Sequence, residues 1–240
     1  DWTWDWLEVN RPDALARFAG QLNTWATTIM TGVGFAWNDP SNNFYYGHMW
    51  ALLTTGYALH GYDDDADLWI ARAKDVMLPE AIKYTRGELV AWETWGNRVG
   101  RAKGGMWNEG TAYGSVDNAL ICSTVLAVQS AEGIAGNEYE NFLWPDEAIR
   151  FFIHATYPTG DHLIAEGDDT GRVPLNPKVR VPVLMMVYLS DSEWKNYGQY
   201  WLNNNADQDY YDYKLYNEFI WYDDQLGQVD YRTALADSNY

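Results

Sequence analysis

Helical spacing of apolar residues is the feature of this sequence that most restricts its fold. Along most of the chain, apolar residues recur three and four positions apart, which places them on one face of an α-helix. The strict alternation that is typical of a half-buried strand is nearly absent. This spacing predicts helices over residues 12–30, 44–60, 65–78, 81–86, 114–132, 145–156, 179–189, 193–204 and 210–222. We expect the third helix to stop at Pro79, because proline lacks the N–H that a helix interior needs.

The order of these helices indicates an all-α fold. Helices joined as antiparallel pairs, with long loops after alternate helices, are typical of an incomplete (α/α) toroid, whose loops form a cleft at one end. A length of 240 residues suits one domain, so we expect residues 1–240 to form a single (α/α) toroid domain. The chain begins at Asp1, without Met or a signal-peptide pattern. We therefore interpret it as a processed protein or as one module of a longer chain.

Composition and charge exclude some classes of function. The sequence has 34 Asp and Glu against 16 Lys and Arg, a net charge of −18, whereas nucleic-acid-binding proteins need a basic face. No apolar run approaches the ~20 residues that cross a bilayer, so we expect no membrane span. Aromatic residues make up 16% of the chain, and aromatic rings stack on the apolar faces of sugars. This composition is typical of secreted carbohydrate-active proteins and predicts a secreted or periplasmic location.

Three polar segments carry the candidate functional residues, and the first covers the start of the second predicted helix. It reads NNFYYGH over residues 42–48. Asn43 and the helix N-terminus both offer donors to an anion. If Asn43 remains in the loop, its side chain and that of His48 can point into one cleft. The alternative is that Asn43 caps the helix and His48 packs at a helix interface.

The second segment, GGMWNEGTAYG over residues 104–114, combines glycines with candidate sugar contacts. Glycines let the backbone approach a ligand, and Trp107 can stack on a sugar ring. Glu109 and Tyr113 are four residues apart, so they can share a helix face. The alternative is a capped helix start in which Tyr113 simply packs. The third segment, DHLIAEGDDTGR over residues 161–172, is either a substrate loop or a weak calcium-binding loop without EF-hand spacing. We expect no metal ion or cofactor.

The first two segments are similar to those of a known group of enzymes. GGMWNEGTAYGS (104–115) resembles the glycine–aromatic–Glu–Gly–x–x–Tyr–Gly segment of heparinase II/III-like and alginate-lyase-like polysaccharide lyases. NNFYYGHMWALLTTGYALHG (42–61) resembles their Asn- and His-bearing helix, although Gly47 stands where these lyases often have Asn. Residues 188–205 and 218–232 resemble the last toroid helices and the connection toward a β-sandwich domain. The resemblance implies an incomplete (α/α) toroid and, as possible partners, further domains of the same polypeptide.

The resemblance also implies β-elimination on a uronic-acid-containing polysaccharide. This reaction needs donors that neutralise the uronate carboxylate, a base for the proton beside it, and an acid for the leaving oxygen. Asn43 would neutralise the carboxylate, His48 would be the base or a charge partner, and Tyr113 would be the acid. A Tyr with a pKa of ~10 needs a cation beside it to act as a base, and the candidates are Arg101, Lys103 and Arg172. The predicted substrate-binding residues are Asn42, Tyr46, Trp107, Asn108, Glu109, His162 and Arg172.

Two other functions remain open at this point. A glycoside hydrolase on a related toroid needs two carboxyl groups ~5–9.5 Å apart, which Glu109 could form with Asp117, Asp161 or Asp168. A non-catalytic carbohydrate-binding or assembly module needs the fold alone. The net charge of −18 repels an acidic glycan at long range, although salt screens this field beyond ~8–10 Å.

Overall fold

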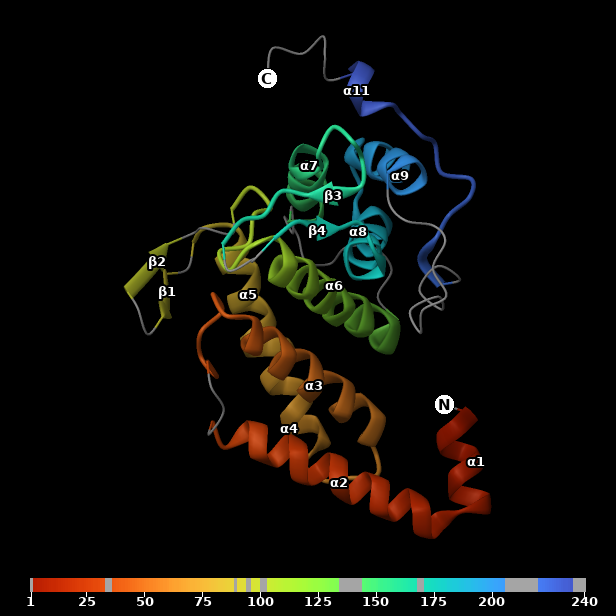
Figure 1. The fold of residues 1–240 in the computed structure, drawn as a ribbon. Helices are drawn as coiled ribbons and strands as arrows, with labels where there is room; N and C mark the ends of the chain where they lie inside the picture. Colours follow the sequence, from red (N-terminus) through yellow and green to blue (C-terminus); the bar gives the residue numbers. More distant parts are fainter. Residues whose placement is uncertain are drawn as a thin grey trace.

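A computed structural model describes residues 2–32, 36–88, 90–93, 96–99, 103–133, 144–167, 171–205 and 220–234. These ranges are mostly helical (Figure 1), which confirms the predicted helical class. The helices are α1 (Trp2–Asn10), α2 (Pro12–Met30), α3 (Asn43–Leu59), α4 (Ala66–Ala71), the π-helix η1 (Arg72–Met77), α5 (Leu78–Thr85), α6 (Thr111–Glu132), α7 (Trp144–Ala155), α8 (Pro177–Leu189), α9 (Trp194–Asn204) and α11 (Tyr231–Ala234). Most of the helix predicted over 210–222 lies outside the described residues.

The helix boundaries follow local sequence signals. Proline is favoured at the first position of a helix, and Pro12 and Pro177 begin α2 and α8. Asn42 caps α3, because its side-chain oxygen accepts the backbone N–H of Phe44 at 3.0 Å. At the other end of a helix, Gly133 adopts the left-handed conformation (φ 65°) that terminates α6.

The prediction that a helix ends at Pro79 was wrong. The chain stays helical from Ala66 to Thr85, and Pro79 lies in the first turn of α5. Directly before α5, the helix η1 has π-helical hydrogen bonds, which join residues five apart in the sequence instead of four. The N–H that Pro79 lacks therefore falls where one bonding pattern changes to the other, and its absence does not break the helix.

Two small antiparallel sheets accompany the helices. β1 (Val90–Glu93) pairs with β2 (Gly96–Val99), and β3 (His162–Leu163) pairs with β4 (Val173–Pro174). Sequence periodicity did not predict these strands, because two to four residues leave no room for a repeated alternation. The second sheet matters for the candidate site, since it brings Val173 and the residues beside it next to the start of α6.

The helices pack as successive layers. α1 and α2 form one end of the stack in Figure 1, α2 packs on α3, and α3 packs on both α4 and α6. α6 in turn packs on α8, and α7, α8 and α9 pack on one another. Large side chains at the layer contacts, such as Tyr45, Trp69, Phe152 and Trp201, are buried and form a continuous core. The predicted ring-like closure of this array stays a prediction.

Candidate functional site

The Glu109 carboxylate joins the start of α3 to the loop that precedes α6. Its Oε2 atom accepts the backbone N–H of Asn43 at 2.9 Å and the indole N–H of Trp107 at 3.1 Å. Its Oε1 atom accepts the side-chain amide of Asn42 at 3.2 Å. A negative charge is favourable at a helix N-terminus, where backbone N–H groups lack partners. We call this arrangement of Asn42, Asn43, Trp107 and Glu109 the Glu109 junction. It ties two segments together that lie more than sixty residues apart in the sequence.

Buried aromatic rings lie behind the Glu109 junction. Tyr46 is fully buried, and its hydroxyl donates to the Pro40 carbonyl at 2.9 Å. The Trp107 ring is 2% exposed and meets the edge of the Tyr46 ring, with centroids 4.9 Å apart. Tyr84 donates to Asn108 Oδ1 at 2.6 Å, and the Asn108 amide donates to the Ser41 carbonyl at 2.9 Å. Tyr46 and Trp107 therefore present no ring face at the surface on which a sugar could stack.

Asn43 and His48 lie on different sides of α3. Asn43 is the first residue of this helix, so it is not part of the loop, and the capping residue is Asn42. Five helical residues separate Asn43 from His48, a rotation of about 140°. The His48 ring lies near Trp37 and Phe44, with centroids 6.0 and 6.4 Å apart. The sequence suggested one cleft into which both Asn43 and His48 point. Residues 43–48 of α3 do not form such a cleft, because the two side chains leave the helix in different directions.

A cavity with a volume of about 300 Å³ is lined by residues at the start of α6, in strand β4 and at the start of α8. Its lining includes Ala112, Ser115, Arg172, Val173, Asn176 and Lys178. Tyr113 follows Ala112 in the first turn of α6, and its side chain is 43% exposed. Arg172 thus lines a cavity that reaches the first turn of α6, and Tyr113 lies in this turn but is not one of the lining residues. We call this feature the cationic cavity.

Positive charge dominates the cationic cavity. Two basic side chains, Arg172 and Lys178, line it, and no Asp or Glu is among the described residues of its wall. Both α6 and α8 begin there, and helix N-termini carry partial positive charge. Asn176 accepts the first free N–H of α8, that of Lys178, at 3.0 Å. An anion in this cavity would therefore be held mainly by the two side chains and the helix dipoles.

No protein-family model, curated protein or solved structure matches this chain.

The segment that carries His162 pairs, as β3, with strand β4, whose Val173 lines the cationic cavity. The His162 ring is 5% exposed and lies against the Tyr157 ring, with centroids 4.1 Å apart. Its Nδ1 atom is hydrogen-bonded to the Asp161 carboxylate, while Nε2 is buried and has no partner among the described residues. The Arg172 guanidinium lies 5.5 Å from the centroid of the same Tyr157 ring. Tyr157 thus helps to position the arginine that reaches the cavity.

Some candidate residues stay untested. Arg101 and Asp168 lie outside the described residues, as does the centre of the proposed calcium loop. Within the described ranges, no cluster of three or more His, Cys, Asp or Glu side chains could hold a metal ion. None of the described helices is long and apolar enough to cross a membrane.

Lys178 is the cavity residue that the sequence analysis missed. It lies in the first turn of α8, directly after Pro177. A positive side chain is unfavourable at a helix N-terminus, where the helix dipole is also positive. This local conflict between residue and position is the sequence signal that could have identified it, since such conflicts concentrate at functional sites.

Asp117 is a buried acid next to the Glu109 junction. It is 1% exposed, and neither carboxylate oxygen has a hydrogen-bond partner among the described residues. Burial raises the pKa of Asp117 well above its ordinary value, and the negative charge of Glu109 raises it further. The charge of Glu109 thus acts on Asp117, but Asp117 is buried and Glu109 accepts hydrogen bonds from Asn42, Asn43 and Trp107. The pair offers no open face to a sugar.

The buried carboxyl of Asp117 makes stability depend on pH. An acid with a pKa raised by folding stabilises the protein fully below its unfolded pKa of ~3.9. This stability is lost at about 1.4 kcal/mol per pH unit until the pH passes the folded pKa. We expect Asp117→Asn, which has no charge to bury, to gain stability relative to the wild type as the pH rises from 4. Urea unfolding of both proteins between pH 4 and pH 8 measures this difference. A difference that stays constant over this range would contradict the buried, uncharged acid.

Proposed function

We propose that the protein binds a uronic-acid-containing polysaccharide at the cationic cavity and cleaves it by β-elimination. The observation that carries this proposal is a cavity lined by Arg172 and Lys178 at the first turn of α6, the turn that also carries the exposed Tyr113, on a protein with a net charge of −18. The resemblance of residues 42–61 and 104–115 to polysaccharide lyases supports it. Part of the proposal is that the stacked helices form an incomplete (α/α) toroid.

Arg172 and Lys178 would neutralise the uronate carboxylate. Neutralisation makes the proton on the adjacent carbon more acidic, because the charge that develops there is delocalised into the carboxylate. The resemblance implies this role for Asn43. Its backbone N–H is taken by Glu109, and the two basic side chains of the cavity are the stronger donors.

Tyr113 would carry both proton transfers. Its phenolate oxygen takes the proton from the carbon beside the carboxylate, and the electron pair of the broken C–H bond forms a C=C bond. The bond from the next carbon to the glycosidic oxygen then breaks, and the pair leaves with the oxygen. Tyr113 returns its proton to this oxygen, so that no net proton is consumed. His48, which lies beside Trp37 and Phe44, has no role in these steps.

Ultraviolet absorbance of the unsaturated uronate product tests the proposal. The substrates are alginate, heparan sulfate, hyaluronan, chondroitin and ulvan, each incubated with the protein. We expect product from at least one of them, and a rate about 100-fold lower for Tyr113→Phe, the usual loss when a general acid–base group is removed. Tyr188→Phe, which changes an exposed tyrosine on α8, is the matched control and should keep the wild-type rate. Arg172→Ala and Lys178→Ala should mainly raise KM.

Each other result identifies a different function. New reducing ends without the ultraviolet product would indicate a glycoside hydrolase. Binding of an acidic glycan without cleavage, by a folded protein, would indicate the non-catalytic module. Full activity of Tyr113→Phe would remove the tyrosine from the mechanism.

A further inference from the structure

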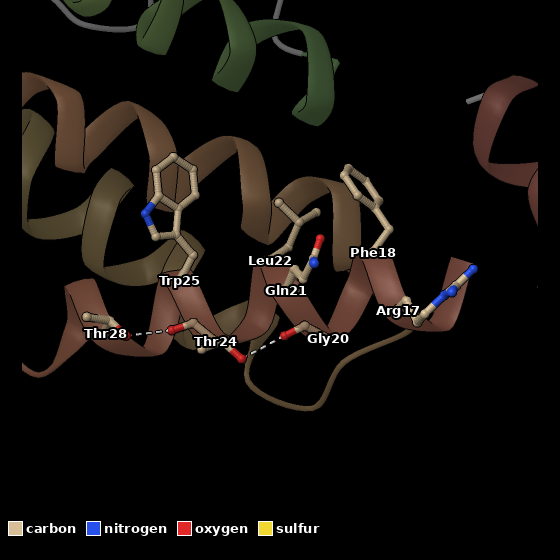
Figure 2. Close-up of a pocket in the computed structure, with 8 residues that line it drawn as sticks. All are labelled: Arg17, Phe18, Gly20, Gln21, Leu22, Thr24, Trp25 and Thr28. Carbon is tan, nitrogen blue, oxygen red and sulfur yellow. Dashed lines mark hydrogen bonds between the residues drawn. The ribbon is translucent and has the colours of Figure 1, made fainter. Parts of the chain in front are cut away.

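A second candidate site lies on α2, at the opposite end of the helical stack from α9 (Figure 1). A groove with a volume of about 620 Å³ follows one side of this helix. Figure 2 shows Phe18 and Trp25 projecting from the same side of α2, with Gln21 and Leu22 between them. The core-facing stripe of α2, formed by Leu15, Ala19, Ala26 and Ile29, lies directly next to this side, and Leu22 of the groove also packs against the core.

The two aromatic rings of the groove are unusually open to solvent. Phe18 is 49% exposed and Trp25 is 58% exposed. Phe18 is steadied by the Trp4 ring of α1, whose centroid is 6.4 Å away. Seven helical residues separate Phe18 from Trp25, which gives a rise of about 10.5 Å and nearly the same direction around the axis. This separation is roughly the length of two sugar units in an extended glycan.

Charge determines which partner fits the groove. Residues 18–31 contain no charged residue, although the whole chain has a net charge of −18. Arg17, at one end of the groove, is paired with Asp13 at 3.5 Å. A second copy of the chain would bring another −18 charge to this face, where the one basic residue of the groove, Arg17, is already paired with Asp13. An uncharged groove is complementary to an uncharged partner.

Polar groups that line the groove suit the hydroxyls of a sugar: Gln21 lies between the two rings, and Thr24 and Thr28 lie on another side of α2 (Figure 2). The Gln21 amide is exposed and has both donors and an acceptor. The hydroxyls of Thr24 and Thr28 donate to the carbonyls of Gly20 and Thr24, at 2.8 and 2.7 Å (Figure 2). Their oxygens remain able to accept hydrogen bonds. Stacking on the rings and hydrogen bonds from the helix surface are the two interactions that hold a glycan.

We propose that the α2 groove binds an uncharged stretch of polysaccharide, with sugar rings stacked on Phe18 and Trp25. This site is separate from the cationic cavity and does not depend on lyase activity. It would hold an uncharged glycan, or the uncharged part of a mixed polysaccharide, to the protein by a salt-independent contact, whereas contacts at Arg172 and Lys178 weaken with salt.

Native affinity electrophoresis tests this site, since a strongly acidic protein migrates fast in such gels. The probes are hydroxyethylcellulose, arabinoxylan, galactomannan and mixed-linkage β-glucan, each cast into the gel. We expect at least one of them to retard the wild-type protein, and Trp25→Ala to weaken this retardation at least about tenfold, because one stacking surface is lost. Trp50→Ala is the matched control, since Trp50 is 40% exposed on α3, and it should be retarded like the wild type.

Other outcomes overturn the proposal. One is the absence of retardation by any of the four probes. Another is equal retardation of Trp25→Ala and Trp50→Ala. A dimer that Trp25→Ala dissociates, measured by light scattering, would assign the groove to a second copy of the chain. Tyr113→Phe and Arg172→Ala should keep the retardation, so failure of the lyase proposal and failure of this one are distinguishable.

Discussion

Gly105→Ala is expected to lower the free energy of unfolding by about 3–5 kcal/mol, and Gly104→Ala by about 1–2 kcal/mol. The two glycines are neighbours with nearly the same left-handed backbone conformation, with a φ angle of 89° at Gly105 and 88° at Gly104. They differ in the space around them. A Cβ atom on Gly105 would lie 2.3 Å from the backbone oxygen of Glu147, in the first turn of α7, whereas a Cβ atom on Gly104 would meet nothing within 4 Å.

Gly104→Ala therefore measures the strain of the left-handed conformation alone. Gly105→Ala adds a clash with backbone, which cannot rotate away as a flexible side chain can. Urea unfolding followed by circular dichroism gives both values under one set of conditions. Equal losses for the two variants would mean that the loop does not lie against α7 as described. Because this loop leads into Trp107 and Glu109, Gly105→Ala should also weaken any activity that depends on the start of α6.

The helices could be predicted from the sequence because their signals are local. Pro12 begins α2, apolar residues repeat along its buried side, and the same logic covers α6, α8 and α9. The continuous helix through Pro79 could not be predicted, because it depends on the change of hydrogen-bonding pattern from η1 to α5. The short strands β3 and β4 depend on two residue pairs, His162 with Pro174 and Leu163 with Val173, and periodicity along the sequence does not report such pairing.

The candidate site was predicted in part. The sequence suggested that residues 42–48 and 104–114 act together, and hydrogen bonds from Asn42 and Asn43 to Glu109 do bring them together. Spacing along the chain does not reveal whether a carboxylate faces a cleft or a neighbouring helix, and Glu109 faces the helix. Composition likewise does not separate a buried tryptophan from an exposed one. Trp107 fills the core, whereas Trp25 stands at the surface.

Glu109→Ala is the second change for which we expect a large effect, a loss of about 3–5 kcal/mol in the free energy of unfolding. It removes three hydrogen bonds to a charged acceptor and leaves the Trp107 indole and the Asn43 N–H without this partner. Hydrogen bonds to charged groups contribute more than neutral ones, and a buried donor left unpaired costs its full desolvation. Urea unfolding measures the loss.

Glu109→Gln separates the charge from the shape of this side chain. The glutamine oxygen can still accept from Asn43 and Trp107, but its amide group then meets the amide of Asn42. We expect a smaller loss, about 1–2 kcal/mol, and a lower pKa for the buried Asp117, because the Glu109 charge that raises this pKa disappears. Glu193→Ala is the control for the helix dipole alone. Glu193 caps α9 without a side-chain hydrogen bond, so its loss should cost less than about 1 kcal/mol.

The two Glu109 variants also decide between a structural and a substrate-binding role for this carboxylate. If it holds α3 to the loop before α6, the proposed glycan cleavage should follow stability: Glu109→Gln stays active at temperatures where it is folded, and Glu109→Ala is active only where it remains folded. If the carboxylate instead contacts the sugar, Glu109→Gln loses binding at every temperature while its unfolding curve stays close to that of the wild type. The three hydrogen bonds of the Glu109 junction favour the first result, because a carboxylate with these partners would have to break them to reach a ligand.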